Sequence, residues 1–219
     1  MLIRELHIET ADLDSTTDFY QKRLGLPVVY QDEIKAGFMI GSSILYIHQR
    51  KDSFAQYHIA FNIPCNKIKE ANEWLNGKAD PIVLDNGFSI VDFRNWNAES
   101  VYFPDNNNNI LEFIARRDLN NSTDHPFNHS GLLSISEIGI VTENVQATCD
   151  WLINKFGLQY FDKQPPLKNF AAVGDDNGLL IVSSAGRMWF PTAISSKACW
   201  QDIYIDIGNK SYILSSSEI

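Results

Sequence analysis

The stretch Leu6-His7-Ile8-Glu9-Thr10 alternates apolar and polar side chains, and a similar stretch, Ile138-Gly139-Ile140-Val141-Thr142, follows at an offset of 132 residues. Two further pairs match at the same offset: Asp18-Phe19-Tyr20 with Asp150-Trp151-Leu152, and Leu24-Gly25-Leu26 with Phe156-Gly157-Leu158. Matches at one fixed spacing indicate an internal repeat, which outranks local propensity in deciding a fold. The chain is therefore predicted to contain copies of one unit.

The first unit is predicted to have the order β-α-β-β-β. Residues 2–10 alternate as a strand does, and a helix follows that Asp12 or Asp14 caps and Gly25 ends. Three more strands are predicted at 26–30, 36–40 and 43–48. A second unit repeats the order, with a strand at 56–63, a helix at 66–76, and strands at 82–85 (a short piece that also reads as loop), 89–94, 100–103 and 110–115.

The segment 118–131 is polar and rich in turn-forming residues, which predicts a linker. We expect residues 1–117 to form a complete two-unit domain that carries the site. Residues 132–219 are expected to form a second domain, with one β-α-β-β-β unit and a truncated fourth unit. The predicted fold class is α+β, with paired units forming cupped mixed sheets and the helices on the outer face. The truncated unit leaves a sheet edge to be covered by the first domain, by residues 188–191 or by a second subunit, and the last option would make a homodimer.

Composition narrows the class of function. The net charge of −9 and the pI near 4.9 argue against a nucleic-acid partner, because phosphate binding needs a basic face. No apolar run approaches the ~20 residues that span a bilayer, and the N-terminus lacks the layout of a signal peptide. Three scattered cysteines fit a reducing compartment. We therefore expect a cytoplasmic protein that acts on a small molecule and has no membrane partner.

Three potential metal ligands, His7, His58 and Glu112, each lie inside an apolar, strand-like run. Strand side chains alternate between faces, so each ligand is expected to point away from its apolar neighbours. A single histidine in a strand is more often structural than a ligand. Two histidines and a carboxylate at matching places in repeated units favour a divalent metal site with open coordination positions.

The paired units, a histidine on the first strand of each, and the run Ser100-Val-Tyr-Phe-Pro-Asp-Asn-Asn-Asn-Asn-Ile-Leu-Glu112 resemble the vicinal oxygen chelate superfamily. This superfamily includes glyoxalase I, extradiol dioxygenases, fosfomycin-modifying enzymes and bleomycin-resistance proteins. The resemblance implies a divalent metal, Fe(II), Mn, Ni or Zn, at positions matching His7, His58 and Glu112. Tyr46 stands where glyoxalase I has a fourth ligand, so a three-ligand site is implied.

The resemblance implies a metal-dependent small-molecule enzyme of the glyoxalase or extradiol-dioxygenase type, whose substrate is chelated through two oxygens. Its reaction would be that of a dioxygenase or of a lyase or isomerase. The alternative is a non-catalytic binding or resistance protein of the same fold, which sequesters its ligand. Candidates for proton transfer are Tyr46, His48 and Tyr102. Candidates for the substrate pocket are Phe38, Arg94 and Trp96; for Phe38 and Trp96, core packing is the plainer alternative.

Overall fold

The computed structural model describes residues 1–52 and 56–218, and its first unit follows the predicted order. The elements are β1 (Leu2–Thr10), α1 (Leu13–Thr17), the π-helical segment η1 (Asp18–Arg23), β2 (Val28–Gln31), β3 (Lys35–Ile40) and β4 (Ser43–Gln49). The side chain of Asp12 caps α1 by accepting a hydrogen bond from the backbone of Ser15 at 3.0 Å. Gly25, with a φ of +71°, allows the chain to turn after the helix.

The second unit has the same order. It consists of β5 (His58–Ile63), α2 (Ile68–Trp74), β6 (Ile90–Phe93), the 3-10 turn η2 (Arg94–Trp96), β7 (Ala98–Pro104) and β8 (Ile110–Arg116). Residues 82–85 form no strand, although Ile82 donates one backbone hydrogen bond to Tyr102. The β-α-β-β-β prediction for this unit is thus confirmed with the short piece as loop.

The third unit is shorter than predicted. After the 3-10 turns η3 (Arg117–Leu119) and η4 (His129–Gly131) come β9 (Ser134–Thr142), α3 (Val145–Phe156), β10 (Phe170–Asp175), β11 (Gly178–Ser184), β12 (Asp202–Ile207), β13 (Lys210–Ser215) and η5 (Ser216–Glu218). Between α3 and β10 the chain makes only an isolated bridge, Tyr160 to Val173, where a third strand was expected. The third unit is therefore β-α-β-β, which corrects the expectation of a complete unit.

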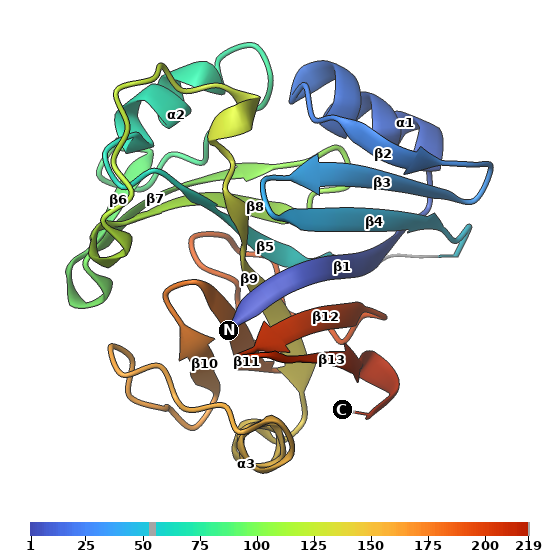
Figure 1. The fold of residues 1–219 in the computed structure, drawn as a ribbon, viewed down its shortest axis with the longest axis vertical. Coiled ribbons are helices and arrows are strands. Elements are labelled where there is room, and N and C mark those ends of the chain that lie inside the picture. Colours follow the sequence, from blue (N-terminus) through green and yellow to red (C-terminus); the bar gives the residue numbers. More distant parts are fainter. Residues whose placement is uncertain (53–55, 219) are drawn as a thin grey trace.

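Strand pairing joins units that are far apart in sequence. β1 pairs with β12, and β5 pairs with β9, both antiparallel. The first and fourth units thus form what we call the outer sheet, β2-β3-β4-β1-β12-β13, and the second and third units form the inner sheet, β6-β7-β8-β5-β9-β11-β10. A single pair, Ile3 with Ile135, connects the two (Figure 1). The sequence predicts that the first unit pairs with the second, whereas the first unit pairs with the fourth; β1 thereby covers the open edge of the fourth unit, which is one of the three expected covers.

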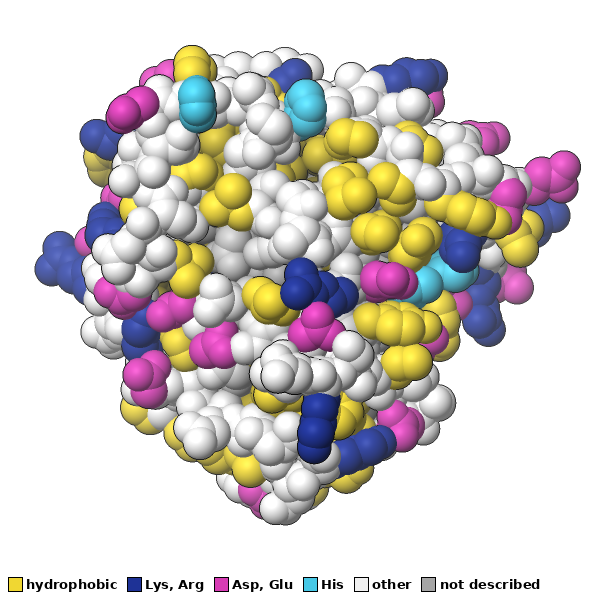
Figure 2. Space-filling model, viewed as in Figure 1, with side chains coloured by type: hydrophobic (Ala, Val, Ile, Leu, Met, Phe, Trp, Pro, Cys, Tyr) yellow, Lys and Arg dark blue, Asp and Glu magenta, His cyan; other side chains and the backbone are white. Residues whose placement is uncertain are grey.

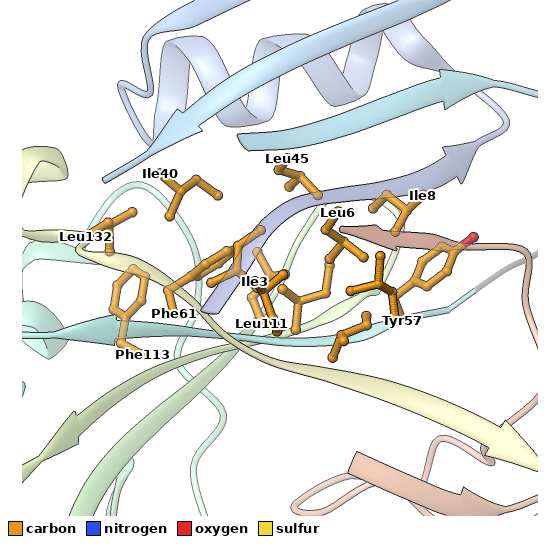
Figure 3. Packing of buried hydrophobic residues seen from close by; sticks show 14 of the residues in the cluster. Ile3, Leu6, Ile8, Ile40, Leu45, Tyr57, Phe61, Leu111, Phe113 and Leu132 are labelled. Carbon is orange, nitrogen blue, oxygen red and sulfur yellow. The ribbon is translucent and has the colours of Figure 1, made fainter. Parts of the chain in front are cut away.

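The two sheets pack through their apolar faces. Leu6, Ile8 and Leu45 of the outer sheet belong to the same buried cluster as Phe61 and Leu111 of the inner sheet (Figure 3). Because strand side chains alternate, the polar residues between them point away from this core. The residues that could carry chemistry therefore lie on the two sheet faces that are turned away from each other.

Three α-helices flank these sheets, with α1 against β3 and β4, α2 against β6, β7 and β8, and α3 against β10 and β11 (Figure 1). The large share of strand in a mixed sheet confirms the α+β class. Among the residues that the structure describes, no helix is long and apolar enough to cross a membrane.

Candidate metal centre

Three buried side chains of the inner sheet bring potential ligand atoms together. Nε2 of His58 on β5 lies 3.6 Å from Oε2 of Glu112 on β8 and 3.8 Å from Oε2 of Glu137 on β9. One ligand atom from each residue lies within 4.8 Å of the other two. Metal–ligand bonds of about 2.1 Å at tetrahedral or octahedral angles would separate neighbouring donors by about 3.0–3.4 Å. This donor set therefore fits a divalent cation after small side-chain movements.

The strand registers explain why these residues meet. Ala60 on β5 is paired with Glu112 in the parallel β5–β8 ladder and with Glu137 in the antiparallel β5–β9 ladder. A methyl group between two carboxylates leaves them room to converge. His58 lies two residues before Ala60, so its ring stands on the same face of the sheet.

A buried arginine holds one of the carboxylates. Arg116, completely buried on β8, donates from Nη2 to Oε1 of Glu137 and from Nη1 to Oδ1 of Asp176 at 3.4 Å. Only Oε1 of Glu137 is used in this way. The other oxygen, Oε2, is the one that lies 3.8 Å from Nε2 of His58.

The electrostatics of the group favour a shared proton or a bound cation. Burial, followed by the charge of Glu137, raises the pKa of Glu112 to about 7. Burial acts to lower the pKa of His58, but the hydrogen bond and charge of Glu137 and the charge of Glu112 outweigh it and raise that pKa. Both shifts express the cost of two carboxylates in a buried place, which a divalent cation would remove.

The group lies on the wall of a cavity of about 270 Å³. Two other lining residues are polar, Gln164 and Arg187. The rest are aromatic or aliphatic: Phe93, Trp96, Tyr102, Leu167, Phe170, Ile181, Trp189 and Phe190. Trp189 packs directly on Gly139, where a Cβ would lie 2.7 Å from the indole ring. The glycine thus lets Trp189 come within 5.4 Å of His58, measured between ring centroids.

His7 does not join this group, which corrects the predicted ligand set. It stands on β1 of the outer sheet, across the apolar core from His58. Its Nδ1 lies 2.9 Å from Nε2 of His48, its Nε2 lies 3.3 Å from Glu5, and its ring lies beside the rings of Tyr46 and Tyr204. Figure 2 shows histidine side chains reaching the surface in this region, over β1 and β4.

The other predicted site residues separate in the same way. Tyr102 and Trp96 line the cavity, and burial together with Glu112 raises the pKa of Tyr102 well above its usual range. Phe38 is completely buried against Tyr20 and belongs to the core. The side chain of Arg94 is 90% exposed beside Asp92, at a neighbouring hollow. Tyr46 and His48 lie with His7 in the outer sheet.

Sequence reasoning missed Glu137, Arg187 and Trp189. A signal for Glu137 was present, because it stands at the offset of 132 residues from Glu5. The parallel ladders place Glu5 opposite Ile44, His58 opposite Ile110 and Glu137 opposite Leu179. Glu5, and not His7, is thus the counterpart of His58 in the first unit.

Solved structures resemble this chain at low sequence identity. A candidate dioxygenase from Bacillus subtilis superposes with a TM-score of 0.61 and 16% identity, over 84% of this chain and 63% of that protein. The chain therefore spans less than two thirds of that dioxygenase. A point mutant of glyoxalase I from Zea mays superposes with a TM-score of 0.56 and 13% identity, over 99% of this chain and 77% of that one. No protein-family model and no curated protein matches the chain.

Proposed function

Because the chain has the fold of the vicinal oxygen chelate proteins, we propose that it is a metal-dependent enzyme acting on a small molecule. The proposed ligands of a divalent metal are His58, Glu112 and Glu137. The observation that carries the proposal is that three buried donors converge within 4.8 Å on the wall of an aromatic cavity. A cavity with a few convergent polar groups and perturbed pKa values is the usual form of an active site.

A divalent metal in this place would supply electrophilic activation of two neighbouring oxygens of a substrate. The protein's own residues would do the rest. Arg116 fixes the orientation of Glu137 by occupying Oε1. The aromatic walls favour a flat substrate. Tyr102, which the β7–β8 register places opposite Glu112, lines the cavity, so its hydroxyl can donate a hydrogen bond to a substrate oxygen.

Metal analysis of protein purified without a histidine tag tests the proposal. We expect about one divalent metal per chain, retained by His7→Ala and reduced at least tenfold by Glu137→Gln or by His58→Ala. His7→Ala is the matched control because it removes an imidazole from the other sheet. Metal-free wild-type protein, or metal lost on His7→Ala and kept on Glu137→Gln, would contradict the proposed ligand set.

The reaction class follows from a second measurement. Oxygen uptake by the Fe(II)-loaded protein with a panel of catechols is expected for a dioxygenase. Turnover of substrate without oxygen uptake is expected for a lyase or isomerase.

One observation favours a second candidate, a binding protein that sequesters its ligand without catalysis. Arg116 already neutralises Glu137, and a protonated His58 would balance Glu112, so the buried charges have partners without a metal. Tight binding of an aromatic ligand by protein that holds no metal would support this candidate over the enzyme.

A further inference from the structure

Arg187 is the one lysine or arginine among the described residues that line the cavity. It lies in the turn after β11, where its backbone donates to Ser184 at 3.2 Å and accepts from Ser196 at 2.8 Å. Its guanidinium carbon stands 4.6 Å from the centre of the Phe170 ring. The backbone of the turn thus holds the base of this side chain, and the stacking places its charge at the aromatic wall.

Arg116 and Arg187 differ in their partners. Arg116 is completely buried and is bound by Glu137 and Asp176. Within the described part of the chain, no carboxylate lies within ion-pair distance of Arg187, whose side chain makes one long hydrogen bond, 3.4 Å, to the carbonyl of Met188. Partial burial lowers the pKa of Arg187, as expected for a cation that loses water and gains no counter-ion. Such a group is suited to binding an anion that enters the cavity.

The shape of the guanidinium narrows the choice of anion. A guanidinium that lies over a ring can still present N–H groups at its edge, and two such groups match a carboxylate in a two-pronged hydrogen bond. The same cavity holds the carboxylates of Glu112 and Glu137, which would repel a dianion such as a phosphonate more than a singly charged group. The flat aromatic walls favour a planar body for the ligand.

We infer that the substrate is a planar aromatic carboxylate whose carboxylate is bound by Arg187, while its two neighbouring oxygens face His58, Glu112 and Glu137. The orientation of the two oxygens rests on the proposed function. The binding of the carboxylate by Arg187 does not, because it depends only on the guanidinium and the cavity.

Calorimetric titration with two matched probes tests the inference. The probes are 3,4-dihydroxybenzoate and its neutral amide, 3,4-dihydroxybenzamide, titrated into protein loaded with Zn²⁺, which does not oxidise them. We expect the carboxylate to bind roughly tenfold more tightly than the amide, the size of one charge-assisted interaction. Arg187→Met should abolish this preference and change the affinity for the amide less than twofold, because the methionine keeps an aliphatic stem over Phe170.

Control variants separate charge from folding. Arg94→Met removes an exposed arginine near the cavity and should keep the full preference. Arg187→Lys should keep part of the preference. This variant replaces Arg187→Met in the test if circular dichroism shows that Arg187→Met is unfolded. Equal affinities for the two probes, a preference that survives Arg187→Met, or tighter binding of the phosphonate analogue would each overturn the inference.

The outcome is distinguishable from failure of the proposed function. Arg187→Met should hold as much metal as the wild type, since Arg187 is not a ligand. A preference for the carboxylate in protein that binds no metal would support Arg187 and refute the metal-dependent enzyme. Stoichiometric metal binding without a preference for the carboxylate would support the metal site and refute the role of Arg187.

Discussion

The inner and outer sheets are built from the same repeated unit, and they differ at a few matched positions. Glu137 and Gly139 on β9 correspond to Glu5 and His7 on β1. Gly139 lies next to His58: a Cβ built on the glycine would be 3.5 Å from the Cβ of His58. In the outer sheet, His7 is the neighbour of Asp202 in the same way. Where the inner sheet has a glycine, Trp189 enters and a cavity forms. Where the outer sheet has an imidazole, its ring occupies the equivalent place. The two sheets thus differ at one matched position, which Trp189 covers in the inner sheet and the His7 ring fills in the outer sheet.

The sheets also treat charge differently. In the inner sheet the ion pair between Arg116 and Glu137 is buried, with side chains 0% and 3% exposed. The outer sheet keeps comparable pairs at the surface, as between Arg4 and Asp206, whose side chains are 41% and 26% exposed. Substitutions in the inner sheet should therefore have the larger effects on stability.

The largest effect is expected from Arg116→Met. It leaves Glu137 and Asp176 without their buried partner, and breaking a buried pair costs about 3–5 kcal/mol of unfolding free energy. Urea denaturation followed by circular dichroism measures the change. The matched control in the outer sheet, Arg4→Met, should cost at most about 1 kcal/mol because its pair is exposed. Equal losses in the two variants would show that burial does not distinguish the two sheets.

Gly139→Ala tests the role of the missing side chain. The new Cβ would lie 2.7 Å from the Trp189 ring, so the indole must shift, at a cost of about 1–3 kcal/mol in unfolding free energy. Tryptophan fluorescence should report the shift. The smaller ring of Trp189→Phe should relieve the clash, so the double variant is expected to lose less stability than the two single variants summed. Strict additivity would mean that Trp189 and Gly139 do not depend on each other.

The smallest effect is expected from His48→Gln in the outer sheet. Burial, then the charges of His7 and Lys35, lower the pKa of His48 to about 4, against the opposing charges of Asp202 and Asp32. The unfolded chain binds the proton near the ordinary value of 6.5, so stability falls as the pH drops from 6.5 toward 4. His48→Gln should reduce this slope in urea midpoints measured from pH 7.5 to 4.5. An unchanged slope in the variant would remove His48 as the source of the acid sensitivity.

Local patterns predicted most elements of the first two units, because alternation, helix caps and turn residues act over a few positions. They identified His58, Glu112, Tyr102 and Trp96 at the cavity. Glu5 and His7 are two residues apart and lie on the same face of a strand, so the apolar pattern cannot tell which of them matches His58 in the repeat. Strand pairing could not be predicted either, because β1 joins β12 through packing between distant parts of the chain. Arg187 and Trp189 lie in an irregular segment with no period to reveal them.

The order of pairing also bears on how the chain is made. Every strand of the inner sheet lies between His58 and Ser184, whereas the outer sheet joins residues 2–49 to residues 202–215. A ribosome releases residues from the N-terminus onward, at about 5–20 per second. The strands that carry the candidate metal centre are therefore made before β12, whereas β1 is made first and pairs with a strand that follows the whole inner sheet in the chain.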